Sequence, residues 1–501
     1  MTQLKELGNP EEFWEYFEII SKIPRCSGKE EKIRTFITKE AEQMGFETKT
    51  DVVGNLVVNI PPGAKNGKNV VLQCHMDIVC EKNNEIEHDF SKDPIELDFI
   101  EIKGEKWITA NGTTLGADNG AGIAYMLTLM KRIYTNELIF KKLGFGLLFT
   151  VNEESGLKGA FDIDKELFKG DILINLDSEE DDTFTIGCAG GINTIAKFDF
   201  SNVFSDFSGQ NIVVLKLIVE GLKGGHSGVD IHLGRGNALK IIGRVLWNLN
   251  NQFDIEIIKI DGGNKANAIP REANCILLVD KHKESEFLDS FNKIKSDIEG
   301  EFKGTDPHIR ISIESLRNYE FHEIFVPKVK NNLLNILKTI PNGPISYHPE
   351  NKDLVHTSTN LASIRTEEKS ITIITSQRSL QESSKKEIYE QIEEVFHLAN
   401  LNINVQHIGD YPGWTPDWDS QIVHISKKIY TELFNDKPKI RVIHAGLECG
   451  ILKKHFPNME MISIGPTIVG PHSPDERLLI KSVSKIWNFL IEIFNHVEKK
   501  F

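Results

Sequence analysis

Apolar residues along the chain form long buried runs that alternate with amphipathic stretches. Continuous apolar runs, typical of strands buried on both faces, occur at 69–80, 145–151 and 171–177. Helical spacing of apolar residues predicts helices at 11–23, 29–44, 123–133 and 479–497. Shorter apolar runs at 440–443 and 459–464 predict two further strands. Strands that alternate with helices in this way predict an α/β domain with a central mixed sheet flanked by helices.

The pattern changes from about residue 190. Predicted elements then follow the order strand, helix, strand, strand, helix, strand over 211–313, and a helix, strand, helix and strand follow over 331–407. The βαββαβ order is typical of an α+β module with its helices on one face of a sheet. We therefore expect an inserted α+β domain at 194–409, long enough for two such modules, and an α/β domain made of 1–193 and 410–501.

Composition and charge narrow the classes of function. Hydrophobic residues at 40% and charged residues at 26% are ordinary globular values, and the longest apolar runs are far shorter than the roughly 20 residues of a membrane span. A net charge of −15 disfavours nucleic-acid binding, which needs a basic surface. The start of the chain lacks the pattern of a secretory signal, so we expect a cytoplasmic protein without a membrane partner. Six scattered cysteines without a CxxC pair predict reduced thiols.

Carboxylates and histidines gather where predicted strands end. His75 and Asp77 are two residues apart near the end of the run 69–80, so we expect them on one face, where an acid can orient a metal-bound imidazole. Glu153 and Glu154 directly follow a second strand, and Asp177 ends a third. A structural His–Asp pair or a solvated loop end explains each of these alone. Three successive strand ends of this kind favour a site at the carboxyl edge of the sheet.

Two further candidates lie in glycine-rich loops. Asp118 stands in TTLGADNGAG just before a predicted helix, where a capping Asp in a surface turn is the simplest interpretation, and His472 stands in GPHSP, where prolines can fix an imidazole in space. Together, two imidazoles and three carboxylates form one donor set: His75, Asp118, Glu154, Asp177 and His472. Such a set suits zinc, manganese or cobalt, and one shared carboxylate would give a dinuclear site.

Polar groups also follow predicted strands in the inserted region. His226 lies in GLKGGHSG, which is equally the composition of a flexible turn. Asn267 opens NAIPR, and Arg378 follows the strand predicted at 371–377, where an arginine can clamp a carboxylate.

Longer motifs carry a family resemblance. The segments QCHMD, TTLGADNGAGIA, NEESGLKGA, LINLDSEE, GCAGG, GLKGGHSG, NAIPREA, YPGW, HAGLECG and SIGPTIVGPHSPDE resemble those of the aminoacyl-histidine dipeptidases in the M20 metallopeptidase family, in the same order from residue 73 to 476. Cys74 departs from the pattern, since glycine is common there in the family. The resemblance implies a zinc-peptidase-like catalytic domain with an inserted lid and dimerisation domain, and a homodimer.

The resemblance also implies roles for the metal-site residues. The carboxylate of Asp118 would bridge two divalent ions, most simply Zn²⁺ with Co²⁺ or Mn²⁺ as alternatives. A strained or cis peptide bond between Asp118 and Asn119 would let its two oxygens face different ions. The remaining ligands would be His75 and Asp177 for one ion, and Glu154 and His472 for the other. Glu153 would be the general base, and Asp77 would orient His75.

The implied substrate is a small peptide, such as the Xaa-His dipeptide β-Ala-His. Four residues would contact this substrate or its oxyanion: His226, Asn267, Arg378 and Gly446. His226 would reach the site on lid closure or from a partner subunit. Two alternatives stay open: a related amidohydrolase or tripeptidase, and an inactive metal-binding or interaction protein on the same scaffold.

Overall fold

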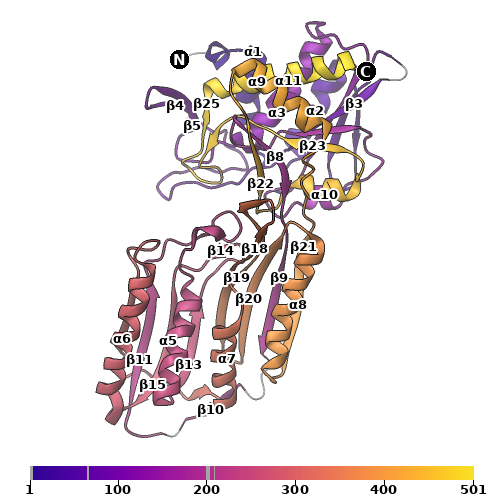
Figure 1. Ribbon diagram of the computed structural model, residues 1–501. Helices are drawn as coiled ribbons and strands as arrows, with labels where there is room; N and C mark the ends of the chain where they lie inside the picture. Colours follow the sequence, from indigo (N-terminus) through magenta and orange to yellow (C-terminus); the bar gives the residue numbers. More distant parts are fainter. Residues whose placement is uncertain (1–3, 65–66, 199–202, 208, 501) are drawn as a thin grey trace. The chain divides into compact units, whose positions relative to one another are not determined.

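The computed structural model describes residues 4–64, 67–198, 203–207 and 209–500. The chain folds as two compact units (Figure 1). Unit 1 comprises the residues up to 188, 414–442 and those from 447 onwards, and unit 2 comprises 189–413 and 443–446. The catalytic role of 1–193 with 410–501 and the lid role of 194–409 stay predictions. Among the described helices, none combines the length and apolar character that crossing a membrane requires.

Unit 1 is built on a sheet with the strand order β1-β2-β6-β3-β7-β23-β8-β22. Its strands are β1 (Glu47–Thr50), β2 (Leu56–Ile60), β3 (Lys68–His75), β6 (Leu143–Thr150), β7 (Ile172–Asn175), β8 (Thr183–Cys188), β22 (Lys439–Ile443) and β23 (Glu460–Ser463). Strands β6, β3, β7 and β23 run parallel, whereas β2 and β8 are antiparallel to their neighbours. The sheet is therefore mixed, which confirms the expected α/β class.

Helices cover both faces of this sheet. One face carries α1 (Glu11–Ser21), α3 (Ala117–Tyr134), α9 (Gln421–Phe434) and α11 (Ile480–Lys500). There the ring of Phe145 on β6 meets Phe494 on α11, and Phe184 on β8 meets Phe489. The other face carries α4 (Lys158–Phe161) and α10 (Glu448–His455), whose apolar residues share a core with β2, β3, β6 and β7. Helix α2 (Glu31–Gln43) packs beside β1 and β2.

A small second sheet in unit 1 positions the loop of His472. Its strands, in the order β24-β25-β5-β4, are β4 (Leu97–Ile102), β5 (Glu105–Ala110), β24 (Ile468–Val469) and β25 (Arg477–Leu479). Strands β24 and β25 pair antiparallel, with Val469 opposite Arg477. The loop between them, residues 470–476, is thereby fixed at both ends.

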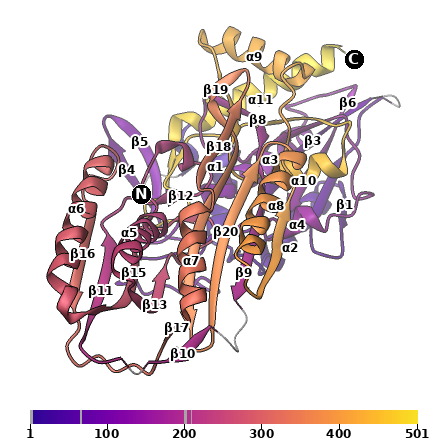
Figure 2. The same ribbon diagram turned by 60° about the horizontal axis from the view of Figure 1, so that its bottom comes forward.

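Unit 2 contains one sheet with the order β16-β11-β15-β13-β19-β20-β9-β21, and β18 pairs with β19. The strands are β9 (Gly190–Phe198), β11 (Ile212–Glu220), β13 (Glu256–Gly262), β15 (Ala273–Asp280), β16 (Arg310–Ser315), β18 (Gly343–His348), β19 (Asn351–Glu367), β20 (Ser370–Ser379) and β21 (Ile403–Tyr411). Four helices lie on one face (Figure 1, Figure 2): α5 (Ala238–Phe253), α6 (Glu284–Phe302), α7 (Pro327–Thr339) and α8 (Glu382–Leu398). Two short pairs complete it: β10 (Phe204–Asp206) with β17 (Glu323–Phe325), and β12 (Gly225–His226) with β14 (Ala268–Ile269).

The sheet of unit 2 has two halves of the same βαββαβ order. One half is β11-α5-β13-β15-α6-β16, and the other is β9-α7-β19-β20-α8-β21 with β18 added. They join where Gly262 on β13 pairs with Ile364 on β19. One apolar core runs through both halves, from Leu217 and Leu277 in the first to Ile373 and Phe396 in the second. The halves therefore share a single core.

The strand expected at 69–80 ends at His75, so the expectation that Asp77 shares its strand is wrong. Beyond Met76 the chain turns onto the segment after α1: the Arg25 guanidinium donates to the Met76 carbonyl at 3.1 Å, and Ile78 N donates to Arg25 O at 3.1 Å. These bonds replace the continuation of the β3 ladder. Asp177 likewise follows β7, which ends at Asn175.

The same turn corrects the prediction for the cysteines. Cys26 and Cys80 form a disulfide with a Cα–Cα distance of 5.8 Å, although 54 residues separate them in sequence. An isolated β-bridge between Cys26 and Ile78 brings the segment after α1 and the segment after β3 together. The other cysteines are free and buried thiols: Cys74, Cys188, Cys275 and Cys449.

The shared core of unit 2 generates a stability prediction. Leu337 on α7 is fully buried, and a Cβ added at Gly243 on α5 would lie 2.8 Å from the Leu337 Cβ, so the two halves are in close contact there. We expect Leu337→Ala to lower the free energy of unfolding by about 2–5 kcal/mol, because it leaves a cavity in a packed core. Urea denaturation measures this. Lys328→Ala, on an exposed position of the same helix, should change it by less than about 0.5 kcal/mol. Equal effects of the two substitutions would contradict the shared core.

Candidate active site

Asp118 sits at an irregular start of α3. The peptide bond between Asp118 and Asn119 is cis, as expected, and both residues have non-helical backbone angles. The carboxylate of Glu476 accepts hydrogen bonds from Gly116 N at 2.8 Å and Asp118 N at 3.1 Å. A Cβ at Gly122 would lie 2.6 Å from the Cβ of Cys74, so glycine is needed for α3 to approach β3. The loop is thus held in place from two sides.

The two oxygens of Asp118 face different imidazoles. Its Oδ1 lies 3.0 Å from Nε2 of His75, and its Oδ2 lies 3.2 Å from Nε2 of His472. Asp177 Oδ1 lies 3.3 Å from the His75 nitrogen, and Glu154 Oε2 lies 3.0 Å from the His472 nitrogen. Five predicted ligands from five separate segments therefore meet, and Asp118 lies between the two pairs.

These side chains fit a pair of divalent cations. The potential ligand atoms of one group lie within 4.8 Å of one another, and the same limit holds for the second group. The first group is His75, Asp118 and Asp177, and the second is Asp118, Glu154 and His472. Glu154 Oε1 is buried without a hydrogen-bond partner among the described residues, which is costly unless a cation contacts it. Nitrogen and oxygen donors without thiolate suit zinc, cobalt or manganese.

Asp77 connects the imidazole to the two glutamates. Its backbone carbonyl lies 3.1 Å from His75 Nδ1, so Nδ1–H donates there and Nε2 faces the carboxylates. Although burial opposes it, those carboxylates, Asp177 foremost, raise the pKa of His75 well above its usual range. The Asp77 carboxylate lies farther from Nδ1, at 3.5 Å. It accepts hydrogen bonds from Glu153 N at 3.0 Å, Glu154 N at 3.1 Å and Ser27 Oγ at 2.7 Å. Asp77 thus orients His75 through its backbone and holds the glutamate segment through its side chain.

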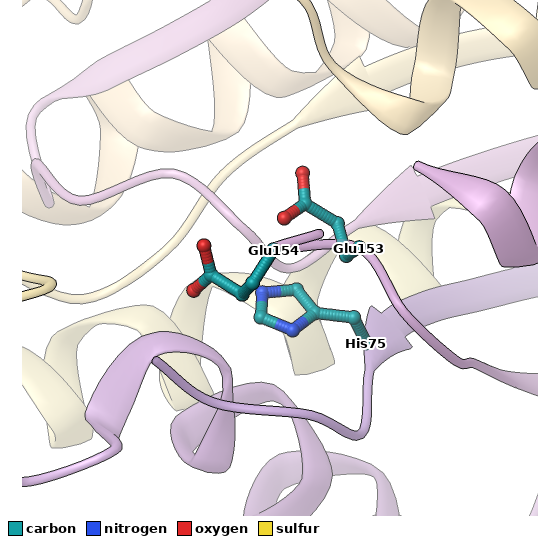
Figure 3. Close-up of side chains that lie close together, drawn as sticks. All are labelled: His75, Glu153 and Glu154. Atoms are coloured by element: carbon teal, nitrogen blue, oxygen red, sulfur yellow. The ribbon is translucent and has the colours of Figure 1, made fainter. Parts of the chain in front are cut away.

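Glu153 and Glu154 follow β6 and point in different directions (Figure 3). A potential ligand atom of Glu153 also lies within 4.8 Å of those of His75 and Glu154. Burial, together with the carboxylates of Asp177 and Glu154, raises the pKa of Glu153 well above its usual range. A carboxylate in such surroundings readily takes up a proton, which is the property of a general base.

Sequence reasoning missed two residues that support the site. Arg25 is buried and donates to the carbonyls of Met76, at 3.1 Å, and Gly116, at 2.6 Å. Glu476, also buried, holds the Asp118 loop from the segment that carries His472. The sequence around Arg25 predicts only a turn after a helix, so the supporting role of Arg25 is evident only from its tertiary contacts. Glu476 lies in the motif SIGPTIVGPHSPDE, four residues after His472.

The predicted substrate residues belong to unit 2. His226 pairs with Ala268 across β12 and β14, beside Asn267, whose carbonyl accepts from Ser227 N at 2.8 Å. His226 Nδ1 accepts hydrogen bonds from Gly228 N at 3.2 Å and from the next amide. Burial, with help from a nearby arginine, lowers the pKa of His226 to about 4. The imidazole is therefore neutral and presents Nε2–H as a donor.

Arg378 and Gly446 meet at Tyr411. The buried Arg378 donates from Nη1 to the Tyr411 hydroxyl at 2.6 Å. A Cβ at Gly446 would lie 2.7 Å from the Tyr411 ring, so glycine is needed there. Two residues before Gly446 in the chain, His444 Nε2 lies 2.7 Å from Ser358 Oγ, and burial lowers the pKa of His444 to about 3. Arg378 Nε is buried without a hydrogen-bond partner among the described residues, so this N–H can still donate to a ligand.

An α/β sheet with these donors at its carboxyl edge and a spare glutamate beside them defines a candidate metallohydrolase. The model of peptidase family M20/M25/M40 matches residues 71–496. The chain belongs to this family.

Individual relatives are similar over the whole chain. The cytosol non-specific dipeptidase of Escherichia coli (strain K12) is 38% identical over 505 residues, covering 100% of both chains. The crystal structure of aminoacylhistidine dipeptidase from Vibrio alginolyticus matches with a TM-score of 0.84 and 37% identity over 97% of each chain. A Staphylococcus aureus tripeptidase structure, 16% identical with a TM-score of 0.57 over 98% of this chain and 99% of its own, shares the fold.

The position of Asp118 between two imidazoles generates a prediction about metal content. We expect Asp118→Ala to lose both ions together, whereas His472→Ala should retain one, because only the first removes a ligand common to both. Elemental analysis of the purified variants after equilibration with Zn²⁺ measures this. Asp171→Ala, which removes a carboxylate at the opposite end of β7, should bind as much metal as the parent. Two ions retained by Asp118→Ala would contradict the bridging role.

The protonation of the ligands generates a second prediction. Hydrogen bonds to the carboxylates of Asp118 and Glu154 raise the pKa of His472 to about 11, and burial raises the pKa of Asp177 to about 6. Both groups therefore stay protonated up to a higher pH than usual, and a metal must displace those protons to bind. We expect metal affinity to increase from pH 6 to pH 8, with release of about one proton or more per protein at pH 7. Calorimetric titration in buffers of different ionisation enthalpy counts the protons, and binding without proton release would contradict this assignment.

Proposed function

We propose that this chain is a cytoplasmic, metal-dependent dipeptidase whose substrates include Xaa-His dipeptides such as β-Ala-His. The observation that carries the proposal is Asp118, whose two oxygens face separate imidazoles, with Glu153 beside them. Family membership and full-length similarity to two dipeptidases support the reaction class. The resident ions are Zn²⁺ in the first instance, with Co²⁺ or Mn²⁺ as alternatives.

The metal ligands divide between two ions. His75 and Asp177 would hold one, Glu154 and His472 would hold the other, and Asp118 would be shared by both. When bound, two such cations lower the pKa of water and polarise a peptide carbonyl, which lowers the barrier to hydrolysis.

Glu153 moves the proton in this reaction. Its carboxylate takes a proton from the attacking water and returns it to the nitrogen of the leaving amine, since one carboxyl group within reach of both atoms can act first as base and then as acid. Asp77 positions Glu153 by accepting its backbone N–H at 3.0 Å.

Unit 2 supplies the groups that recognise the peptide. His226, neutral with its Nε2–H as donor, hydrogen-bonds the oxyanion that develops on the scissile carbonyl. Arg378 binds the free C-terminal carboxylate, which selects the last peptide bond of the substrate for cleavage. Asn267 and Gly446 complete the contacts to the substrate. A homodimer is part of the proposal.

A substrate panel with one variant tests the proposal. The parent should cleave Ala-His and β-Ala-His but leave N-acetylalanine and Ala-Ala-His, the substrates of the alternative hydrolases, intact. Glu153→Gln should lower kcat/KM by roughly 10²–10⁴-fold, because it removes the proton acceptor, while its metal content stays unchanged. Glu137→Gln, in an exposed turn, is the matched control and should be as active as the parent.

Three results would reject parts of the proposal. Cleavage of the tripeptide or the N-acyl amino acid in preference to dipeptides would assign the chain to the alternative hydrolases. Full activity of Glu153→Gln would remove the proposed base. A parent that binds two ions but cleaves no dipeptide would reject the dipeptidase activity itself.

A further inference from the structure

Glu448 is a buried carboxylate that takes no part in the chemistry above. It is the first residue of α10 and is 0% exposed. Its Oε2 accepts hydrogen bonds from Gln73 Nε2 at 2.6 Å and from Thr150 Oγ1 at 2.7 Å. Burial raises the pKa of Glu448 to about 7. A charge held out of water at this depth is costly, so its retention calls for a reason.

The two donors continue into a chain of buried hydrogen bonds across the sheet. Asn175 Nδ2 donates to Gln73 Oε1 at 2.6 Å, and Ser463 Oγ donates in turn to Asn175 Oδ1. Ser178 Oγ lies 2.9 Å from Ser463 Oγ at the far end of this chain. Every bond of known direction in this series points toward Glu448. Above pH 7 the Glu448 carboxylate is mostly ionised and only accepts, which fixes this direction for the whole series.

This network lies directly behind the candidate metal ligands. On β3 the alternate residues Val71, Gln73 and His75 share one face, because side chains two apart on a strand point the same way. On β7, Leu173 and Asn175 share the corresponding face, and Asp177 follows two residues later. Val71 and Leu173 belong to the apolar core, whereas Gln73 and Asn175 belong to the Glu448 network.

The network also fixes how the strand ends are linked. The Gln73 amide must point its nitrogen at Glu448 and its oxygen at Asn175, since the carboxylate cannot donate. In that orientation Gln73 connects β3 to β7 two residues before His75 and Asp177. Thr150, the last residue of β6, is attached to the same carboxylate three residues before Glu153. Gln73 Nε2 also donates to Thr150 Oγ1 at 3.1 Å, so the loss of Glu448 removes the shorter of its two hydrogen bonds and loosens this orientation.

We propose that Glu448 is a positioning residue for the ion that His75 and Asp177 would hold. The inference rests on the metal centre proposed above and goes beyond it by making one ion dependent on α10. The other ion has further supports that do not involve Glu448: Glu154 N donates to Asp77, and the His472 loop is fixed by β24 and β25. Loss of Glu448 therefore lowers the protein's affinity for one ion more than for the other.

Titration of the metal-free full-length protein with Zn²⁺, followed by calorimetry, tests this inference. The parent should bind two ions. Glu448→Met, similar in length but without an acceptor, should bind one ion as the parent does and the other about 10–100-fold more weakly, the usual effect of losing a group that orients a metal ligand. Glu448→Gln should restore the parent affinities to within a few-fold, because its amide oxygen can accept both hydrogen bonds.

Two further variants keep the test decisive. Gln73→Met breaks the link between Glu448 and Asn175 and should show the same selective loss, even if Glu448→Met fails to fold. Ile451→Ala removes buried apolar packing from the same helix without touching the network, so it should lower thermal stability and leave both affinities unchanged.

The outcomes separate this inference from the proposed function. Unchanged affinities in Glu448→Met or Gln73→Met would overturn the inference alone, and so would an equal weakening of both ions that Ile451→Ala reproduces. A parent that takes up no Zn²⁺ would overturn the proposed metal centre and the inference with it. Selective loss of one ion, with rescue by Glu448→Gln, supports both.

Discussion

Mutual repulsion among three carboxylates withdrawn from water is the constraint on which the rest of the site depends. Two such charges about 4 Å apart repel by about 4 kcal/mol at an effective dielectric constant near 20. Asp118, Asp177 and Glu154 are nevertheless held within reach of only two imidazoles, and one oxygen of Glu154 has no hydrogen-bond partner among the described residues. Two divalent cations would relieve this repulsion. The folded protein therefore holds its carboxylates in an arrangement that favours metal binding.

Buried hydrogen bonds hold that arrangement against its own repulsion. Arg25 and Glu476 fix the loop of Asp118, while Asp77 fixes the segment of Glu153 through two backbone N–H groups. Behind them, Glu448 accepts hydrogen bonds from Gln73 and Thr150 near the ends of β3 and β6. Each of these groups is buried, and each holds backbone or side chains at a ligand or within a few residues of one. The support is therefore distributed over helices and loops on both sides of the sheet, as preorganised metal sites require.

The sequence predicted those parts of the molecule that local patterns encode. Apolar runs followed by acids located β3, β6 and β7 and led to His75 and Glu153. Long-range contacts were out of reach: Gln73 and Glu448 are 375 residues apart, and the Cys26–Cys80 disulfide depends on a turn that periodicity does not show. Strand β19 was missed because its centre is polar; buried Thr357 is matched by Ser379 across the sheet at 3.0 Å. Tertiary partners, absent from any local window, make such residues acceptable in a strand.

The central claim is that Asp118 bridges two ions. Crystals grown with Zn²⁺ and measured at the zinc absorption edge test it most directly, because anomalous scattering locates each ion independently of the surrounding protein. The account predicts two peaks about 3.5–4 Å apart, with one oxygen of Asp118 coordinated to each. A single peak, or a second peak that Asp118 does not contact, would contradict it.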